Sequence, residues 1–399
     1  MSDRVSSVFE AASGARVAPL AVHPGMFIDR TTTLYGPSKT GKTVIIKAIM
    51  NELAPHVPEV LVVSPTEPSN RSYSGIVDAP LIQYRMYLPP SEGEKKRAND
   101  EKAGAQRFLD AIWQRQEMKA AIYSRVNDPR TLRGLFERAR RLDPHAARVG
   151  DEALGRLARA RERTLAGLSV SLSGVARSDA IAAASDKFDE MLVLLYKKCI
   201  TPLRDELWRM PGLDEDAVYT LNYLHFNPRI LLIFDDCAAE LKPFFNSETF
   251  RKIFYQNRHV KVTAVIACQD DTDLPSNLRK NSFVNFFTTE TVCTSNFTRV
   301  SNRYPKAEQK FASEVAPELF ADKFRKLAYI REDPHKFYYI KVPPLPPFHF
   351  GSAAVRELCG AVGQEGVAMD RSNPFFERFA VGGGSASGSA GGPGTAARN

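Results

Sequence analysis

The sequence predicts an α/β fold with a mostly parallel central sheet and one helical insertion. Short apolar runs alternate with helical patterns, which is typical of parallel sheets. The runs lie at residues 31–35, 60–63, 230–234, 262–267 and 283–287. Between the second and third runs, residues 91–211 contain helical patterns and no strong strand. This break indicates a helical segment inserted into the α/β domain.

A phosphate-binding pattern follows the first strand. Glycines let such a loop wrap a triphosphate, and the next helix N-terminus offers partial positive charge. Lys42 is placed to reach the β- and γ-phosphates of ATP, and the Thr43 hydroxyl to bind Mg²⁺. A glycine-bearing loop without a nucleotide is the alternative. The residues that fit G-x-x-x-x-G-K-[ST] are Gly36, Pro37, Ser38, Lys39, Thr40, Gly41, Lys42 and Thr43.

Two acidic residues follow the strand at 230–234. Asp235 fits the magnesium-coordinating acid of the second nucleoside triphosphatase motif. Asp236 is placed to orient or deprotonate the attacking water. Gln269 follows the next strand, where its amide can contact the γ-phosphate or the water. The alternatives are an ordinary turn for the two acids and a polar strand end for Gln269.

Two arginines are candidates for an arginine finger that acts on a neighbouring subunit. Arg279 is the first, because it is expected on a loop near the carboxyl edge of the sheet. Arg258 is the second. A surface arginine without such a role is the alternative.

The insertion is expected to form helices at 102–124, 131–142, 152–168 and 179–208. Arginines that neutralise DNA phosphates would explain its composition. A solvated helical face with interleaved Glu and Asp would explain it as well. The crowded arginines are Arg130, Arg133, Arg138, Arg140, Arg141, Arg148, Arg156, Arg159, Arg161 and Arg163.

The composition of the chain bears on its cellular compartment and on the kind of partner it binds. The net charge of +8 and pI of about 9.1 suit a nucleic-acid partner without establishing one. The five cysteines are scattered without a C-x-x-C pair, which favours a reducing compartment. No apolar run approaches the ~20 residues of a transmembrane segment, and no secretory signal is expected.

The C-terminal third predicts a hairpin and a tail. Residues 327–330 and 337–340 are expected to form a hairpin that closes the sheet at its edge. The aromatic segment 373–379 either docks on a partner protein or packs on its own domain. From residue 381 onward the chain is Gly/Ser-rich and expected to be disordered.

A series of short segments occurs in a specific order: residues 36–43, 64–66, 231–236, 257–259, 267–269 and 278–281. Together they resemble the genome-packaging ATPases of nucleocytoplasmic large DNA viruses, in the FtsK–HerA superfamily of P-loop NTPases. The resemblance covers about residues 27–341 and skips the insertion. It implies a RecA-like core, ATP hydrolysis with Mg²⁺, a homo-oligomeric ring and translocation of double-stranded DNA into a capsid. Capsid or membrane-associated virion proteins would be further partners, inside the host cell or the virion.

The resemblance also implies residue roles. Lys42 and Thr43 would bind phosphate and Mg²⁺, Asp235 would hold Mg²⁺, Asp236 would act on water, and Gln269 would sense the γ-phosphate. Arg279 would be the trans-acting finger. The chain departs from the pattern in two places. It has Asp235-Asp236 where the superfamily often has Asp-Glu, and Lys39-Thr40 where the viral family often has Gly-Ser.

The expected organisation is an N-terminal extension (1–25), a RecA-like core (26–90 and 212–350), a basic helical insertion (91–211), a C-terminal segment (351–380) and a tail (381–399). Two other functions stay open. A nucleotide-kinase-type phosphotransferase would be a monomer with the insertion as its lid. A virion-assembly or DNA-binding scaffold would bind nucleotide without turnover. The absence of an N-K-x-D element for guanine argues against a GTPase.

Overall fold

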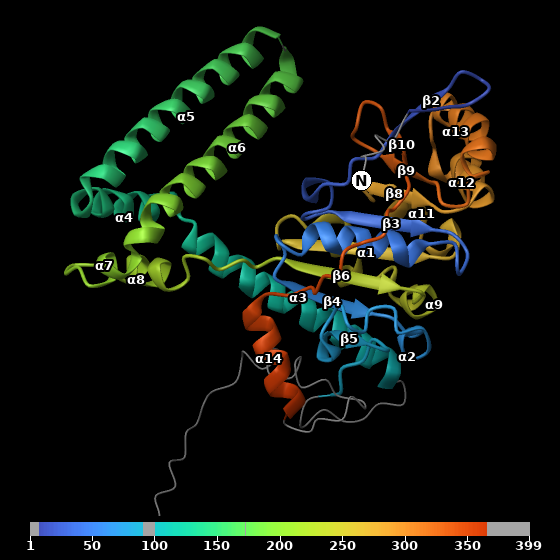
Figure 1. Ribbon diagram of the computed structural model, residues 1–399, viewed down its shortest axis with the longest axis horizontal. Helices are drawn as coiled ribbons and strands as arrows, with labels where there is room; N and C mark the ends of the chain where they lie inside the picture. Colours follow the sequence, from blue (N-terminus) through green and yellow to red (C-terminus); the bar gives the residue numbers. More distant parts are fainter. Residues whose placement is uncertain (1–7, 91–99, 172, 365–399) are drawn as a thin grey trace, which may run out of the picture. The chain divides into compact units, whose positions relative to one another are not determined.

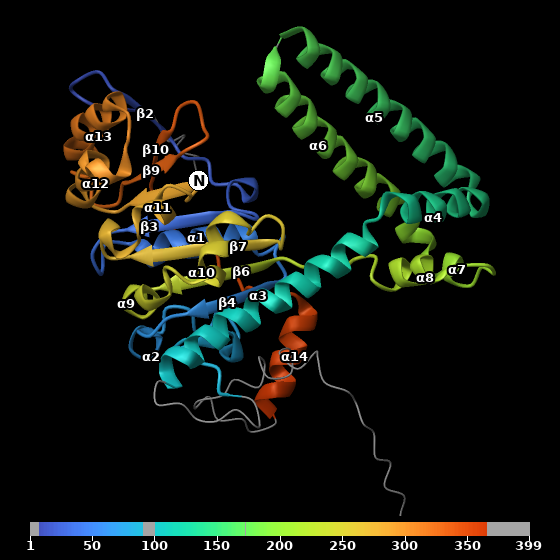
Figure 2. The ribbon, with the colours of Figure 1, turned by 180° about the vertical axis from the view of Figure 1, so that it is seen from behind.

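The computed structural model describes residues 8–90, 100–171 and 173–364 of the 399-residue chain. The chain divides into two compact units. Met1–Glu117 with Arg229–Asn399 form the sheet unit, and Met118–Pro228 form the helical unit. Figures 1 and 2 show the elements of both. The aromatic segment 373–379 and the Gly/Ser-rich tail predicted at 381–399 lie outside the described residues.

The sheet unit is built on a sheet with the strand order β1-β2-β10-β9-β8-β3-β7-β6-β4-β5. From β8 to β5, each strand is parallel to its neighbours within that stretch. These strands are β8 (Val284–Phe287), β3 (Thr31–Tyr35), β7 (Val262–Cys268), β6 (Ile230–Asp235), β4 (Glu59–Val63) and β5 (Ile82–Gln83).

Strand β7 lies between β3 and β6. Tyr35 pairs with Cys268, and Ala267 pairs with Asp235. The carboxyl ends of the three strands therefore meet at one edge of the sheet, which we call the carboxyl edge. The loop after β3 and the acids after β6 thus come to the same edge, although they are not on adjacent strands. This is the RecA-like arrangement that the sequence predicts, and the predicted fold class is confirmed.

The strand sequences explain why the sheet is buried on both faces. Every residue of β6 is buried, as expected for a central parallel strand with a continuous apolar run. Strand β3 is instead rich in threonine, whose β-branched side chain favours strands. Two of its three buried threonine hydroxyls find partners: Thr31 donates to the Ile253 carbonyl at 2.9 Å, and Thr33 to Asn285 Oδ1 at 2.6 Å. Thr32 Oγ1 has no hydrogen-bond partner among the described residues. These partners offset the cost of burying polar groups.

The hairpin prediction was right in its strands and wrong in its position. Strands β9 (Lys326–Ile330) and β10 (Phe337–Ile340) pair antiparallel, and β9 pairs with β8. The sheet does not end there, because β2 (Arg16–Pro19) adds in parallel to β10 and β1 (Phe9–Glu10) pairs with β2. Part of the predicted N-terminal extension therefore belongs to the sheet.

Helices cover both faces of the parallel strands. Helix α1 (Lys42–Leu53) lies on one face, in front in Figure 1, and α10 (Glu248–Tyr255) and α3 (Asp100–Val126) are in front in the reverse view of Figure 2. Side chains of α3 bind that second face, where the Gln116 amide donates to the Val260 carbonyl at 3.0 Å. The further helices are α2 (Glu67–Asn70), α9 (Ala238–Leu241), α11 (Ser276–Arg279), α12 (Glu290–Thr298), α13 (Lys306–Leu319) and α14 (Ala353–Gln364).

The helical unit has a small core of its own. One face of α4 contributes Leu132, Leu135, Phe136 and Ala139, at the spacing of an amphipathic helix. Figure 1 shows α5 and α6 side by side as an antiparallel hairpin. The helices are α4 (Pro129–Leu142), α5 (Pro144–Ser171), α6 (Gly174–Ile200), α7 (Arg204–Trp208) and α8 (Glu215–Asn222).

Several helical boundaries differ from the prediction; α5, for example, begins at Pro144 rather than at residue 152. The helix expected at 179–208 ends at Ile200, and a 3₁₀ turn over Thr201–Leu203 precedes α7. Pro202 explains the break, because proline lacks the N–H that a continuous helix needs. The compact helical unit begins at Met118 within α3, so the first part of α3 belongs to the sheet unit. Among the described helices, none is long and apolar enough to cross a membrane.

Candidate nucleotide-binding site

The loop between β3 and α1 has glycines where side chains are not tolerated. Gly36 has φ +150° and Gly41 has φ +100°, conformations that other residues rarely adopt. A Cβ on Gly36 would lie 1.8 Å from Thr288 Oγ1. Any larger residue at position 36 would therefore push against the residue that follows β8.

Side-chain hydrogen bonds fix the middle of this loop. Thr40 Oγ1 lies 2.7 Å from the Pro37 carbonyl and 2.6 Å from Thr288 Oγ1, and its single hydrogen can be donated to either oxygen. Thr288 Oγ1 also lies 3.1 Å from the Tyr35 carbonyl, to which it donates. The loop is thereby tied to the end of its own strand and to the neighbouring strand β8.

The two loop lysines have opposite environments. Lys42 is buried, with 7% of its surface exposed, and its ammonium donates to the carbonyls of Gly36 and Pro37 inside the loop. Burial lowers the pKa of Lys42, and Asp235 and Asp236 oppose that shift. Lys39 is exposed and has φ +65°. Within the described part of the chain, its ammonium has no hydrogen-bond or ion-pair partner.

Asp235 is the buried acid of the site. One of its oxygens, Oδ2, accepts from Tyr73 Oη at 2.7 Å and from Thr43 Oγ1 at 3.3 Å. Burial raises the pKa of Asp235, whereas the Tyr73 hydrogen bond and the charge of Lys42 lower it. The loop threonine, the loop lysine and this carboxylate therefore form one group, as the sequence predicts for their positions.

Tyr73 is held by a carboxylate that the sequence did not single out. Glu67 is buried, and its oxygens accept the backbone N–H groups of Ser72, Tyr73 and Ser74, each at 2.8 Å. This clamp shapes the turn after β4 so that the fully buried Tyr73 ring directs its hydroxyl at Asp235. The only sequence signal for it is the loop at 64–67, at the end of a predicted strand.

Asp236 and Gln269 meet across the carboxyl edge. Gln269 Nε2 donates to Asp236 Oδ1 at 2.8 Å. Asp236 has φ +57°, a left-handed conformation that is uncommon outside glycine, although aspartate tolerates it better than most residues. The backbone N–H groups of Gln269 and Asp270 both donate to Asp273 Oδ2, at 2.9 and 3.0 Å. The loop after β7 is thus fixed from within.

Arg279 lies close to the loop that follows β7, but its side chain is buried rather than projecting from the carboxyl edge. It is buried, with 7% of its surface exposed, and its guanidinium contacts the buried Asp271 at 3.0 Å. Arg299 binds both oxygens of the same carboxylate at 3.0 Å. An arginine finger must project beyond its own subunit, so this geometry does not support that role for Arg279. Its partner Asp271 lies eight positions upstream, and the local sequence does not reveal that this carboxylate is buried.

Arg258 lies at the opposite edge of the sheet, which we call the amino edge. Asn257 and Arg258 precede β7, Arg30 precedes β3, and Lys280 precedes β8. They line a pocket of about 420 Å³ that also includes His259, Arg331 and Glu332. Arg258 is exposed. Burial lowers the pKa of Arg30, and the neighbouring charge of Arg258 lowers it further.

The donor set at the carboxyl edge fits a magnesium ion. Thr43 Oγ1 and Asp235 Oδ2 lie 3.3 Å apart, and Mg²⁺ in nucleotide sites is usually held by one or two protein oxygens plus phosphates and water. Among the described residues there is no cluster of three or more His, Cys, Asp or Glu side chains that could hold a metal without such help. The geometry therefore suits a metal that arrives with a nucleotide.

Sequence comparison identifies the relatives of the chain. No family model matches it. The B354L protein of African swine fever virus, isolate Pig/Kenya/KEN-50/1950, is 44% identical over 374 residues, which cover 92% of this chain and 97% of the relative. The chain belongs to the B354L family. A B354L protein of isolate Tick/Malawi/Lil 20-1/1983 has the same identity and coverage. The B354L family thus includes proteins of a large DNA virus, in line with the resemblance found in the sequence.

Solved structures give more distant likenesses. The genome packaging NTPase B204 from Sulfolobus turreted icosahedral virus 2 is 10% identical, covers 80% of this chain and 98% of its own, and has a TM-score of 0.32. The plasmid coupling protein TrwB is 12% identical, covers 82% and 87%, and has a TM-score of 0.34. Neither likeness is close enough to carry an argument about function.

Proposed function

We propose that this chain is an ATPase that works as a ring-shaped motor and moves double-stranded DNA into a viral capsid. One observation carries the ATPase part. The loop residues Lys42 and Thr43 lie at the same sheet edge as Asp235, with Thr43 and Asp235 joined at 3.3 Å. The DNA and capsid parts rest on the ordered motifs of the sequence and on the viral origin of the B354L family.

The loop would bind the phosphates of ATP. Its backbone N–H groups and the N-terminus of α1 offer partial positive charge, and the Lys42 ammonium lies inside the loop. Thr43 and Asp235 would hold Mg²⁺, which supplies charge neutralisation of the β- and γ-phosphates when bound. Tyr73 is a positioning residue in this scheme, because it orients the Asp235 carboxylate without reaching the nucleotide.

Asp236 and Gln269 would act on the attacking water. The Asp236 carboxylate accepts one amide hydrogen of Gln269, so the amide plane is fixed and its oxygen is directed by the protein. A fixed amide can donate to a phosphate oxygen and accept from water. Asp236 is then the base candidate, placed by its left-handed backbone conformation.

Arg258 is the better candidate for the trans-acting finger. A head-to-tail ring brings different faces of neighbouring subunits together. The amino edge of one subunit, with exposed Arg258, would then face the carboxyl edge of the next subunit. An arginine supplied in this way stabilises the charge that develops on the phosphates.

The helical unit would contact the DNA load. Eight of its ten singled-out arginines are exposed, and exposed arginines neutralise backbone phosphates without reading sequence. Three of the ten have partners within the chain: Arg140 pairs with Glu137 and Asp151, Arg138 binds the Pro211 and Gly212 carbonyls, and Arg163 donates to the Arg159 carbonyl. Capsid or membrane-associated virion proteins are the proposed anchoring partners, in the infected cell or the virion.

The test is an ATPase assay on the purified oligomer, with and without double-stranded DNA, beside its mass in solution. A motor requires turnover that DNA stimulates and a mass that is a multiple of the 44.4 kDa chain. Turnover that needs a small acceptor, from a monomer, would indicate a phosphotransferase. Nucleotide binding without turnover under all conditions would indicate a scaffold.

A further inference from the structure

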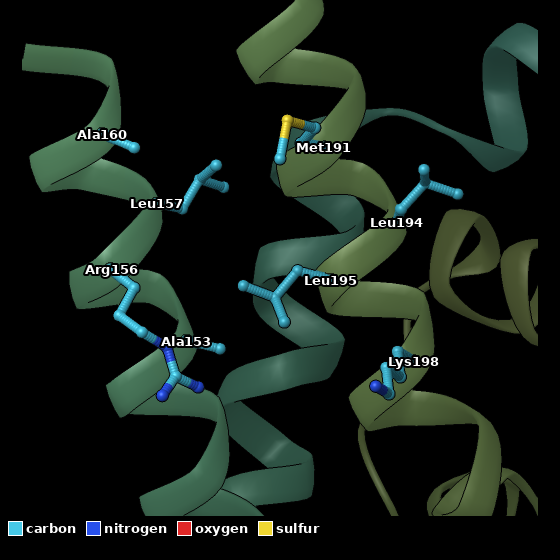
Figure 3. Close-up of a pocket in the computed structure, with 8 residues that line it drawn as sticks. All are labelled: Ala153, Arg156, Leu157, Ala160, Met191, Leu194, Leu195 and Lys198. Carbon is cyan, nitrogen blue, oxygen red and sulfur yellow. The ribbon is translucent and has the colours of Figure 1, made fainter.

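The α5–α6 hairpin of the helical unit carries an apolar groove that the ATPase proposal does not use. Its volume is about 470 Å³ (Figure 3). The apolar residues that line it recur at helical spacing on both helices, so each helix turns one stripe toward the groove. They are Ala153, Leu157 and Ala160 on α5, and Met191, Leu194 and Leu195 on α6.

The groove is open rather than filled by the hairpin itself. Leu194 is 65% exposed and Met191 is 45% exposed. Two helices alone bury only one side of each apolar stripe, and a third helix in the groove would complete a small bundle. The small side chains of Ala153 and Ala160 leave room for larger side chains of an incoming helix, as Figure 3 shows.

Charge at the rim selects among possible occupants. The charged residues that line the groove are Arg156 and Lys198. Both lie at the same end of it, because α5 and α6 run antiparallel and Figure 3 shows the two side chains at that end. A second copy of the hairpin would bring the same two cations, which would repel Arg156 and Lys198 rather than neutralise them. An apolar floor offers nothing to the sugar–phosphate backbone of DNA.

We propose that this groove binds an amphipathic α-helix of another protein, with leucine-type residues facing the groove and acidic residues at the end beside Arg156 and Lys198. The apolar residues would supply the affinity, and the two cations would set the direction of the bound helix. The site is separate from the nucleotide site, so it is testable whether or not the ATPase proposal holds.

The probe is a fluorescent synthetic helix of about 21 residues with leucines at i, i+3, i+4 and i+7 and glutamates at the flanking positions. Its twin has lysines in place of the glutamates. Fluorescence anisotropy with the full chain should show binding of the acidic peptide, with at least tenfold weaker binding of the basic twin. Leu194→Glu should abolish binding, because it places a charge in the apolar lining of the groove. The matched control is Val175→Glu, which changes a residue that is 77% exposed and lies outside the groove.

A charge reversal tests the direction-setting role. Arg156→Glu with Lys198→Glu should weaken the acidic peptide by roughly tenfold, the sum of two exposed ion pairs, and should strengthen the basic twin. Equal binding of the two peptides, or binding that survives Leu194→Glu, would overturn the proposal. It would also be overturned if light scattering showed a self-association that Leu194→Glu alone abolishes, since the groove would then belong to a second copy.

Discussion

The carboxyl and amino edges of the parallel sheet differ in how their charges are satisfied. At the carboxyl edge, Lys42 binds loop carbonyls and Asp235 accepts two side-chain hydroxyls. At the amino edge, Arg258 is exposed beside Arg30 and Arg331 in an open pocket. The carboxyl edge holds the candidate phosphate-binding loop. The pocket at the amino edge is lined by more basic than acidic side chains. In the proposed ring, the amino edge of one copy would face the carboxyl edge of the next.

The largest expected effect is at the carboxyl edge. Lys42→Ala should reduce ATP turnover to background, because the buried ammonium is the cation inside the phosphate loop. A phosphate-release assay with MgATP measures this. Lys39→Ala is the control, since that lysine is exposed and outside any ion pair of the described chain. A comparable loss in Lys39→Ala would show that the two lysines were assigned the wrong way round.

The next effect tests the amino edge. Arg258→Ala should lower turnover by roughly a thousandfold, the contribution of an arginine finger, while nucleotide binding is retained. Because the arginine would act in trans, a mixture of Arg258→Ala and Lys42→Ala subunits should recover activity that neither variant has alone. In mixed rings, an intact loop of one subunit meets an intact arginine of its neighbour. No recovery at any mixing ratio, with mixed oligomers demonstrated by mass, would remove Arg258 from the role.

Arg279 provides the contrast to Arg258. Arg279→Ala should lower the free energy of unfolding by about 3 kcal/mol, because it breaks a buried ion pair and leaves Asp271 with less compensation. Thermal and denaturant unfolding measure this change. Arg258→Ala should leave the unfolding midpoint nearly unchanged. If Arg279→Ala unfolded like the unmodified chain yet lost turnover, the buried geometry would not describe its role.

A smaller effect concerns the pKa of Asp235 and its binding of Mg²⁺. Tyr73→Phe should weaken the apparent Mg²⁺ affinity by about tenfold, since it removes a hydrogen bond to a charged group. The Tyr73 hydroxyl lowers the pKa of Asp235, so its removal raises that pKa further. Asp235 must be ionised to hold Mg²⁺, and turnover is lost as the pH falls through its pKa. The acidic limb of the pH–rate profile should therefore move to higher pH.

Tyr329→Phe is the matched control for Tyr73→Phe. Tyr329 is also buried and also donates to a carboxylate, Glu308, at 2.8 Å. The same chemical change is made at a hydrogen bond outside the site. It should cost similar stability without moving the Mg²⁺ dependence or the pH profile. Equal shifts in both variants would mean that Tyr73 has only a structural role.

The smallest expected effect is at Lys39. Its left-handed backbone conformation costs a lysine about 1 kcal/mol relative to a residue that adopts it freely. Lys39→Gly should therefore raise stability by up to about 1 kcal/mol, less the entropy that glycine gains in the unfolded chain. Chemical denaturation measures it. A clear loss of stability would show that the lysine side chain contributes contacts of its own.

Local patterns predicted much of the sheet unit. Strands such as β3 and β6 are short apolar or β-branched runs, and their boundaries follow from residues that are buried on both faces. The positions of Lys42, Thr43 and Asp235 followed from the same patterns, because parallel strands bring their carboxyl ends together. The residue roles themselves stay predictions until the variants are measured.

Contacts between residues far apart in the chain could not be predicted from local sequence patterns. Tyr73 reaches Asp235 across 162 positions, and no local pattern distinguishes it from a core tyrosine. Arg279 is buried against Asp271, and the same carboxylate also accepts from Arg299 and Asn302 later in the chain. Strand β2 was missed because a four-residue strand with the sequence Arg-Val-Ala-Pro has too little apolar character to stand out.

The helical unit is one continuous stretch of the chain, inserted into the sheet unit between β5 and β6. Every strand pairing that frames the nucleotide site is made by residues outside Met118–Pro228. Evolution can therefore lengthen, shorten or exchange this module without changing the register of a single strand. Related proteins could in this way differ in their helical units while the candidate nucleotide-binding site stayed the same.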